Sequence, residues 1–354
     1  MKRVTVRASR EYEVRIGRGI LKDAGEQIRE ITGPAAAMIV TDDIVGELYG
    51  RELEENLTAA GFSVCSFRFP HGEAQKNLQT YGELMETLCE RRLTRKDIIV
   101  ALGGGVTGDL AGFAAATYQR GIRFVQIPTT LLACVDSSVG GKTAVDLRGG
   151  KNQAGCFYQP SLVLCDPDTL RTLPDEQYRC GLAEVIKYAL IGSPELYRDL
   201  MEKDIRDTEE EVITSCVAMK RDIVERDEFD TGERMLLNFG HTFGHAAESC
   251  SDFSILHGQA VAMGMAVMTR SACAKGYCDS GTVSAVEQIL HKYRLPDTIP
   301  YSSDALEQMI RSDKKMSGQM IRIVVPREVG NCSVITIPAD ELTDWMREGG
   351  IHCG

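Results

Sequence analysis

Residues 97–109 read DIIVALGGGVTGD, from Asp97 to Asp109. The first half, Asp97–Leu102, is an apolar run that predicts a buried β-strand, and it stops at three glycines, Gly103–Gly105. Glycines here let the backbone approach a pyrophosphate, and the helix that follows offers free N–H groups and the positive end of its dipole. The stretch therefore predicts a strand, a phosphate-binding turn and a helix, although such turns also occur for packing alone.

Further strand and helix patterns flank this stretch. Apolar or alternating runs predict strands at Lys2–Arg7, Tyr12–Ile16, Ala36–Thr41, Phe62–Phe69 and Phe124–Ile127. Helical spacing at Ile44–Ala60 and Leu78–Arg92 separates several of these runs. Strands that alternate with helices favour a parallel sheet that is covered by helices on both faces.

The pattern changes after about Leu173, where helical spacing becomes dominant. One interruption, Met320–Pro326 and Cys332–Ile337 around Gly330-Asn331, predicts a β-hairpin. The sequence therefore predicts an α/β fold with a Rossmann-like parallel-sheet domain over residues 1–173, expected to bind NAD. A mostly α-helical domain should cover residues 174–354.

Composition and charge limit the classes of function. The chain has 354 residues and a net charge of −11, which disfavours non-specific nucleic-acid binding because that needs a basic face. No apolar run reaches the roughly 18 residues that span a bilayer, and the start lacks the apolar middle of a signal peptide. We therefore expect no nucleic-acid partner, no membrane association and a cytoplasmic location. The 12 cysteines lack metal-binding spacing, so we expect reduced thiols.

The glycine-rich turn lacks one feature of the usual dinucleotide site. That site places an acid about 20 residues after the turn, but the corresponding stretch here, Phe124–Pro128, contains none. Asp42, at the carboxyl end of an earlier predicted strand, is the natural candidate for an acid that binds the ribose. The predicted dinucleotide site is therefore not a standard Rossmann site.

Two further segments place charged residues close to glycines. Asp136 lies in an otherwise apolar stretch, so it should be paired or functional. Lys142 and Lys151 each follow a pair of glycines, which places a cation beside flexible backbone that can hold a phosphate. The alternative is that each lysine is a solvated surface charge.

Histidines form the most specific cluster. Of six histidines, His241, His245 and His257 fall within 17 residues, and the first two share a helix face. Three imidazoles, or two with a carboxylate, suit a catalytic metal with an open coordination position. Glu184 and Lys187, one turn apart in an apolar predicted helix, supply a carboxylate and a cation. Hydrogen-bonded core histidines and a structural Glu/Lys pair are the alternatives.

With these residues in place, the sequence resembles the 3-dehydroquinate synthase family of sugar-phosphate cyclases. The resemblance rests on motifs that follow in order through almost the whole chain: Gly72–Lys76, Gly103–Asp109, Ile127–Thr130, Ser138–Thr143, Gly150–Asn152, Thr172–Pro174, Gly181–Lys187 and Leu237–His245. Such an ordered set is far more specific than the glycine-rich turn alone.

The resemblance implies roles for individual residues. Glu184, His241 and His257 would bind one divalent metal, zinc or cobalt, whereas spacing alone favours His241 with His245. NAD would be held by Asp42, Glu73, Lys76, Gly104, Gly105, Val106, Asp109, Thr129, Thr130, Lys142, Lys151 and Thr172. The substrate would be held by Arg120, Lys142, Asn152, Lys187, Lys220, Arg234, Asn238, His245 and Lys314. Catalysis is assigned to Asp136, Glu184, Lys187 and His245, and Arg120 would reach across the interface of a homodimer.

The implied substrate is 3-deoxy-D-arabino-heptulosonate 7-phosphate, which a lyase of the shikimate pathway of aromatic amino acid biosynthesis would convert to 3-dehydroquinate and phosphate. The predicted cations suit a phosphate and a carboxylate, for which Arg234 offers a planar fork. Two alternatives remain open. One is a metal- and NAD-dependent polyol or alcohol dehydrogenase, and the other is a sibling cyclase whose sugar phosphate lacks the carboxylate.

Overall fold

The computed structural model describes residues 1–252, 254–312 and 320–352. The chain forms two compact units. Unit 1 contains Met1–Pro174 and Glu209–Phe229, and unit 2 contains Asp175–Thr208 and Asp230–Gly354. Lys314, one of the predicted substrate residues, lies outside the described residues. Among the helices that are described, none has the length and apolar character needed to cross a membrane.

Unit 1 is built on a seven-stranded sheet with the strand order β1-β2-β9-β6-β5-β3-β4. The strands are β1 (Lys2–Arg7), β2 (Glu11–Ile16), β3 (Ala36–Asp42), β4 (Ser63–Phe69), β5 (Ile98–Gly103), β6 (Arg123–Pro128) and β9 (Leu162–Cys165). The β1–β2 pair is antiparallel, and the other neighbouring pairs are parallel. The predicted Rossmann-like parallel sheet is therefore confirmed.

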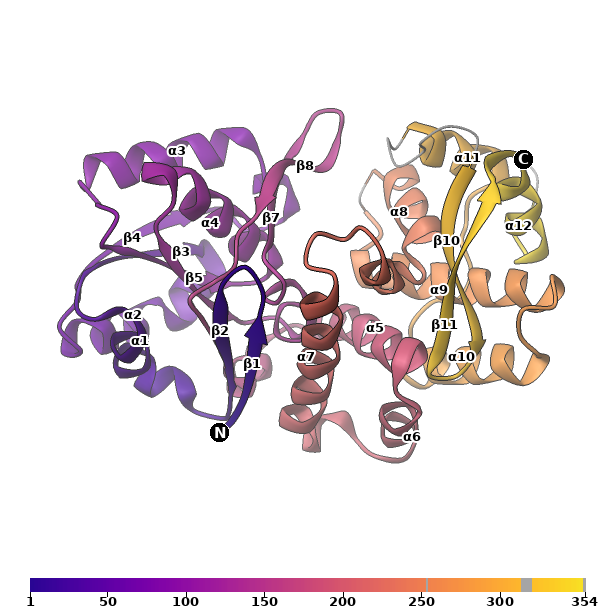
Figure 1. Ribbon diagram of the computed structural model, residues 1–354, viewed down its shortest axis with the longest axis horizontal. Helices are drawn as coiled ribbons and strands as arrows, with labels where there is room; N and C mark the ends of the chain where they lie inside the picture. Colours follow the sequence, from indigo (N-terminus) through magenta and orange to yellow (C-terminus); the bar gives the residue numbers. More distant parts are fainter. Residues whose placement is uncertain (253, 313–319, 353–354) are drawn as a thin grey trace. The chain divides into compact units, whose positions relative to one another are not determined.

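Helices cover both faces of this sheet (Figure 1). The helices α1 (Ala24–Thr32) and α2 (Asp43–Ala59) lie on one face, and α3 (Leu78–Glu90) and α4 (Gly105–Thr117) lie on the other. Successive side chains of a strand point to opposite faces. Ile39 and Val100 therefore pack with α1 and α2, while Met38 and Ile99 pack with α3 and α4. This double burial explains why the central strands are almost wholly apolar.

The strand order reverses between β3 and β5. The chain leaves β3 through α2 towards β4 on one side, and it leaves β5 through α4 towards β6 on the other side. Both strands end at the same edge of the sheet, β3 with Asp42 and β5 with Gly103. In parallel α/β sheets, ligands bind outside the carboxyl ends of the strands at such a reversal. Asp42 and the glycine-rich turn thus lie next to each other where a nucleotide is expected.

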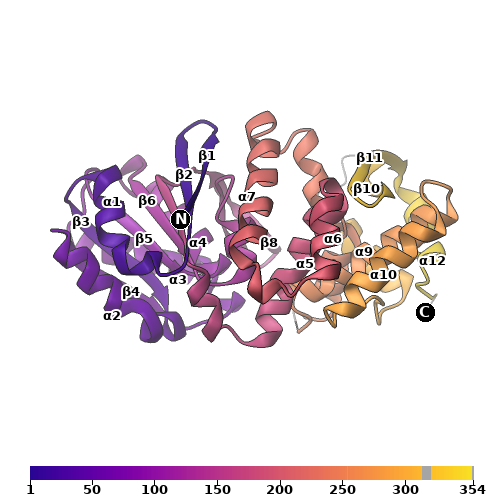
Figure 2. The same ribbon diagram turned by 90° about the horizontal axis from the view of Figure 1, so that it is seen from below.

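Two more elements complete unit 1. The strands β7 (Lys142–Leu147) and β8 (Gly150–Phe157) form an antiparallel hairpin that the sequence patterns do not predict. The helix α7 (Glu209–Arg226) packs against β1, beside which it lies in Figure 2. In α7, Glu211 binds Lys2 at 3.0 Å, and Glu209 binds Arg18 at 2.9 Å.

The sequence patterns predict that residues 209–229 belong to the second domain, whereas in the structure they belong to unit 1. The ion pairs that join α7 to Lys2 and Arg18 connect residues that are far apart in the sequence. Helical periodicity marks α7 as a helix but does not indicate which unit it joins, because that depends on these distant contacts.

Unit 2 is mostly helical. Its helices are α5 (Asp175–Gly192), α6 (Pro194–Glu202), α8 (His241–Cys250), α9 (His257–Ala274), α10 (Ser280–Lys292), α11 (Ser303–Ser312) and α12 (Leu342–Glu348). The strands β10 (Met320–Glu328) and β11 (Asn331–Pro338) form the predicted hairpin, and Gly330 in its turn has a φ of 84°. Helices α8 and α9 lie very close together. The absence of a side chain at Gly264 permits this approach, since a Cβ there would collide with the carbonyl oxygen of Gly240.

Candidate active site

A buried carboxylate and two imidazoles meet in unit 2. Glu184 lies in the middle of α5, His241 is the first residue of α8, and His257 is the first residue of α9. The Nε2 atoms of His241 and His257 lie 3.6 and 3.4 Å from the same oxygen, Oε1 of Glu184. Gly258 permits this approach, because a Cβ at that position would overlap the backbone of Cys180 in α5. Three helices thus bring one oxygen and two nitrogens to one point.

The second ring nitrogen of each histidine also has a partner. Nδ1 of His241 lies 3.1 Å from the carbonyl oxygen of Phe239, and Nδ1 of His257 lies 3.4 Å from Oε2 of Glu248. A carbonyl oxygen only accepts, so His241 donates from Nδ1, and the lone pair of its neutral ring is on Nε2. Histidines that bind metals typically donate their other ring N–H to a carbonyl or a carboxylate. Both rings are therefore oriented to bind a metal through Nε2.

The surroundings of Glu184 fit a bound cation. Its side chain is 1% exposed, and neither carboxylate oxygen receives a hydrogen bond of normal geometry. The carboxylate forms an ion pair with Lys187, which is equally buried. Burial acts to lower the pKa of His257, but Glu184 and Glu248 outweigh it and raise that pKa to about 9. Acids so placed favour additional positive charge, and one oxygen with two imidazole nitrogens suits a divalent transition metal.

His245 belongs to the same cluster. One ligand atom from each of His241, His245 and His257 lies within 4.8 Å of the other two. The ring centroid of His245 is 5.1 Å from that of His241 and 5.7 Å from that of His257. The structure thus brings together all four residues considered as ligands, and the shared oxygen of Glu184 favours His241 with His257.

Two predicted substrate residues lie directly before α8. Arg234 and Asn238 belong to a short 3-10 helix, Glu233–Asn238, which leads into His241. The side chain of Arg234 is among the largest that are fully buried in the chain. A fixed guanidinium and the histidine cluster are therefore only a few residues apart on one continuous segment of unit 2.

The carboxyl edge of the unit 1 sheet carries a network of charged and polar side chains. Nζ of Lys76 lies 2.6 Å from Oδ2 of Asp109 and 2.6 Å from Oδ1 of Asn152. Nζ of Lys151 lies 3.4 Å from Oε1 of Glu73. Burial acts to lower the pKa of Lys76, but Asp109 and Glu73 outweigh it and raise that pKa above its usual value. Four predicted NAD residues and one predicted substrate residue are thus brought together.

The remaining predicted cofactor residues lie at or near the carboxyl ends of strands. Asp42 caps α2 by accepting a hydrogen bond from the N–H of Val45 at 2.8 Å. The N–H of Thr129, after β6, donates to the carbonyl oxygen of Gly103 at 3.0 Å. The hydroxyl of Thr172 lies 2.6 Å from that of a tyrosine in α2. The residues of this group are Asp42, Gly104, Gly105, Val106, Thr129, Thr130 and Thr172.

Asp136, which is half-buried, and Lys220, which is buried, form a second ion pair in unit 1. Lys220, on α7, pairs with the carboxylate of Asp136 and donates to its backbone carbonyl oxygen at 2.8 Å. The side chains of Lys142, at the start of β7, and of Arg120 are exposed. Arg120 has a left-handed φ of 64° and follows Gln119 at 53°, so two residues in a row adopt a conformation that is uncommon without glycine.

Two residues in these networks are absent from the set predicted from the sequence. Glu248, the partner of His257, is buried and lies two turns after His241 on α8. That spacing on one helix face is a signal that could have identified it. Asp146 accepts a hydrogen bond from the N–H of Asn152 at 2.7 Å. It belongs to the β7–β8 hairpin, so no sequence pattern indicates its contact.

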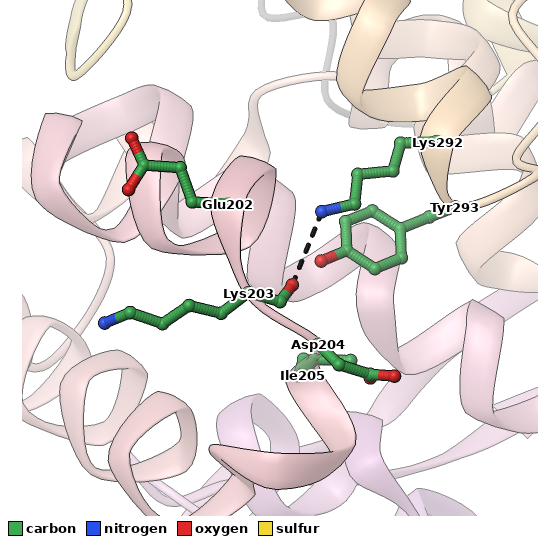
Figure 3. Close-up of a pocket in the computed structure, with 6 residues that line it drawn as sticks. All are labelled: Glu202, Lys203, Asp204, Ile205, Lys292 and Tyr293. Atoms are coloured by element: carbon green, nitrogen blue, oxygen red, sulfur yellow. Dashed lines mark hydrogen bonds between the residues drawn. The ribbon is translucent and has the colours of Figure 1, made fainter.

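A pocket in unit 2 has a structural explanation (Figure 3). Its lining consists of Glu202, Lys203, Asp204, Ile205, Lys292 and Tyr293. Nζ of Lys292 donates to the backbone carbonyl oxygens of Leu200 at 2.5 Å, Met201 at 2.9 Å and Lys203 at 3.4 Å. These groups lie at the end of α6, where carbonyls lack partners within the helix. Lys292 therefore caps α6, and the lining includes none of the predicted site residues.

Similarity to known proteins identifies the family. Residues 66–180 match the family model described as 3-dehydroquinate synthase N-terminal, and residues 181–316 match 3-dehydroquinate synthase C-terminal. The 3-dehydroquinate synthase of Enterococcus faecalis (strain ATCC 47077 / OG1RF) is 43% identical over an alignment of 358 positions, which covers 99% of this chain and 100% of that protein.

Solved structures share the whole fold. A 2-deoxy-scyllo-inosose synthase complexed with carbaglucose-6-phosphate, NAD+ and Co2+ has a TM-score of 0.89 and 26% identity, over 98% of this chain and 100% of that chain. The 2-epi-5-epi-valiolone synthase of Streptomyces hygroscopicus subsp. jinggangensis 5008, with NAD+ and Zn2+ bound, has a TM-score of 0.88 and 26% identity. The match covers 98% of this chain and 99% of that chain. The fold is that of the sugar-phosphate cyclases. Within this class, the chain belongs to the 3-dehydroquinate synthase family.

Proposed function

We propose that the chain converts 3-deoxy-D-arabino-heptulosonate 7-phosphate to 3-dehydroquinate and phosphate, with catalytic NAD and one divalent metal, zinc or cobalt. This makes it a carbon–oxygen lyase of the shikimate pathway. Membership of the family supports the reaction. The observation that carries the chemistry is the buried carboxylate of Glu184, which faces Nε2 of His241 and of His257.

Glu184, His241 and His257 would hold the metal in unit 2. Cyclases with this fold have been solved with Co2+ or Zn2+. A metal bound there polarises a substrate hydroxyl and makes it more acidic. His245 would contact the substrate. Lys187 would form an ion pair with Glu184 and would also bind the substrate. Glu248 would be a positioning residue, because its carboxylate holds the ring of His257.

NAD would bind at the carboxyl edge of the unit 1 sheet. The reversal of strand order and the helix N-terminus that follows Gly104 support this placement, as does the NAD+ in two structures with the same fold. The residues assigned to it are Asp42, Glu73, Lys76, Gly104, Gly105, Val106, Asp109, Thr129, Thr130, Lys142, Lys151 and Thr172. When bound, NAD accepts a hydride from C5 of the substrate and later returns it.

The chain's own residues would bind and orient the substrate. Arg234 would hold the carboxylate with a planar, bidentate contact, and lysines would balance the charge of the phosphate. Oxidation at C5 would make the neighbouring C–H acidic. An oxygen of the substrate's own phosphate would take that proton, the C–H electrons would form a C=C bond, and phosphate would leave with the electrons of its C–O bond. Asp136 would fix the ammonium group of Lys220. The full set for the substrate is Arg120, Lys142, Asn152, Lys187, Lys220, Arg234, Asn238, His245 and Lys314.

We further propose a cytoplasmic homodimer in which Arg120 completes the substrate site of the neighbouring subunit. Arg120 is exposed in a left-handed turn of unit 1, which presents its side chain outwards. Subunits that carry Arg120→Ala should regain activity when mixed with subunits that carry Lys142→Ala. Activity no higher than the sum of the two parents would mean that each chain builds its own phosphate site.

The deciding experiment supplies the heptulosonate phosphate with substoichiometric NAD. Because the hydride leaves C5 and returns to C5, we expect many equivalents of phosphate and dehydroquinate and no net rise in absorbance at 340 nm. A dehydrogenase would instead accumulate one NADH per product. Stoichiometric NADH without phosphate release would falsify the synthase assignment.

Arg234→Leu separates this substrate from sugar phosphates that lack the carboxylate. Loss of a charge-assisted, bidentate contact should cost about 2–4 kcal/mol of transition-state binding, a rate loss of roughly 30- to 1,000-fold. Metal and NAD content should stay intact in this variant. An unchanged rate would favour a sibling cyclase.

A further inference from the structure

The hairpin β7–β8 carries Lys142, Lys151 and Asn152, and its strand register is irregular. Val145 pairs with Ala154 and Leu147 pairs with Gly150, so residues 151–153 of β8 lie opposite a single residue of β7, Asp146. Asn152, at the centre of this bulge, has a left-handed φ of 56°. Such a conformation costs free energy for a residue with a side chain and persists only where the surrounding contacts determine it.

Asp146 supplies these contacts. Its Oδ1 accepts a hydrogen bond from the N–H of Asn152 at 2.7 Å, which satisfies a backbone donor that the bulge removes from the strand ladder. Its own N–H donates to the carbonyl oxygen of Lys76 at 2.8 Å, and a β-bridge joins it to Asn77. Asp146 therefore ties the bulge to the segment that precedes α3.

The position of the bulge decides which side chains meet. Oδ1 of Asn152 accepts a hydrogen bond from Nζ of Lys76 at 2.6 Å, and the same Nζ binds Asp109 at 2.6 Å. Lys151, the other residue of the bulge in this network, lies 3.4 Å from Glu73. A shift of the bulge by one residue would turn both side chains to the opposite face of the hairpin.

We propose that Asp146 is a positioning residue for the nucleotide and phosphate site, acting through the backbone of Asn152 to hold Lys151 and Asn152 against Lys76 and Glu73. The identity of the ligand rests on the proposed function, whereas the effect on the hairpin does not.

The chemistry required of Asp146 is that of a hydrogen-bond acceptor. Burial raises the pKa of its carboxyl group, although the N–H of Asn152 and Lys76 act in the opposite direction. The surroundings therefore do not favour the charge itself. An asparagine has an oxygen at the same position and should replace the aspartate, whereas an alanine should not.

The test compares Asp146→Ala and Asp146→Asn with a matched control, Asp97→Ala, in the full-length protein. Asp97 also accepts from backbone donors, the N–H of Ala36 at 2.8 Å and that of Thr94 at 2.6 Å. It precedes β5 and so lies at the opposite edge of the sheet from the site. Asp146→Ser, whose hydroxyl is too short to replace the carboxylate, takes the place of the alanine variant if that variant does not fold.

We measure the Kd for NAD and the hydrogen exchange of a peptide that covers residues 148–153. Loss of the acceptor in Asp146→Ala should weaken NAD binding by about 10-fold or more and should accelerate exchange in the hairpin alone. Asp146→Asn should stay close to the wild type in both measurements, and Asp97→Ala should change neither.

Unchanged hairpin exchange in Asp146→Ala, or an equal loss of NAD affinity in Asp97→Ala, would overturn the proposal. So would an Asp146→Asn variant as defective as the alanine variant, because the role would then lie in the charge. If the wild-type protein does not bind NAD, the proposed function fails, and the exchange measurement still decides the role of Asp146.

Discussion

The carboxyl edge of the unit 1 sheet and the histidine cluster of unit 2 both gather charged residues, but they balance charge differently. At the edge, each described lysine of the network has an acid: Lys76 lies 2.6 Å from Asp109, and Lys151 lies 3.4 Å from Glu73. In the cluster, one oxygen of Glu184 faces two imidazoles, and the neighbouring acids raise the pKa of His257 to about 9. At the edge each of these two lysines faces an acid, whereas in the cluster an acid that already pairs with Lys187 also faces two imidazoles, an arrangement that suits an added cation.

Among the changes that test this comparison, removal of the metal from the histidine cluster should have the largest effect on the reaction rate. A chelator should lower the rate of phosphate release by about 1,000-fold or more, because the substrate hydroxyl loses its Lewis acid, and zinc or cobalt should restore it. His257→Ala should lose the metal, since only two ligands remain. Metal analysis by mass spectrometry checks this, and full occupancy in His257→Ala would show that the ligand set is wrong.

His245→Ala is the matched control for the ligand set. It removes an imidazole from the same cluster, one turn away from His241. We expect it to retain the metal and to lose rate, because His245 is assigned to the substrate. Loss of the metal in this variant would favour the three histidines as ligands in place of the set with Glu184.

Lys76→Met should test how much the ion pair with Asp109 stabilises the edge of unit 1. Removal of one partner leaves Asp109, whose side chain is only 19% exposed, without this lysine, which should lower the free energy of unfolding by about 2–3 kcal/mol, below the range for a fully buried pair. Lys151→Met, whose ion pair with Glu73 is partly exposed, should cost about 0–1 kcal/mol. Urea unfolding measures both, and equal losses would contradict the idea that burial makes the first pair important.

The pH dependence of Lys76→Met follows from Asp109. Burial raises the pKa of Asp109, and Lys76 opposes that rise, so the variant should raise the pKa further. A group whose pKa is higher in the folded state binds more protons when folded, and it therefore adds stability as the pH falls. The deficit of the variant relative to the wild type should shrink towards acidic pH.

Glu248→Gln should have a smaller effect, confined to the cluster. Weaker orientation of the His257 ring should raise the Kd of the metal by about 10- to 100-fold, the range for partners of metal ligands. Competition with a chromogenic chelator measures this without turnover. Glu287→Gln, which removes a 2.7 Å ion pair with Arg270 elsewhere in unit 2, controls for the substitution and should leave the Kd unchanged.

Lys292→Met should have the smallest effect and should spare both regions. Loss of the cation that caps α6 should lower the free energy of unfolding by about 1 kcal/mol. Metal content and the Kd for NAD should not change, because this pocket is structural. A weaker Kd for a phosphorylated ligand in Lys292→Met would show instead that the pocket of Figure 3 binds substrate.

Local sequence patterns are sufficient for much of the fold. The run Ile98–Leu102 is buried on both faces of the sheet, so its apolar character appears directly in the sequence. The hairpin around Gly330 follows from its turn residues. The eleven described cysteines are free thiols, as the sequence predicts. These features are determined by residues that are close in the sequence, or by surroundings that are the same on both faces of a strand.

Contacts between distant segments are what the patterns miss. The irregular register of β7–β8 hides Asp146, and α7 joins unit 1 through ion pairs with residues near the start of the chain. Spacing alone pairs His241 with His245, whereas the crossing of α5, α8 and α9 brings His257 to Glu184.

The return of the chain to unit 1 has a consequence for its biosynthesis. The chain leaves this unit at Pro174 and rejoins it at Glu209, and the contact between Lys2 and Glu211 spans 209 residues. A ribosome that has translated the whole sheet has therefore not yet made the helix that packs against its first strand. Until α5 and α6 have been synthesised and α7 follows them, β1 lacks the helix that packs against it, and Asp136 lacks its partner Lys220. Contacts of such long sequence separation slow folding, so translation of residues 175–208 sets a minimum waiting time before unit 1 can be completed.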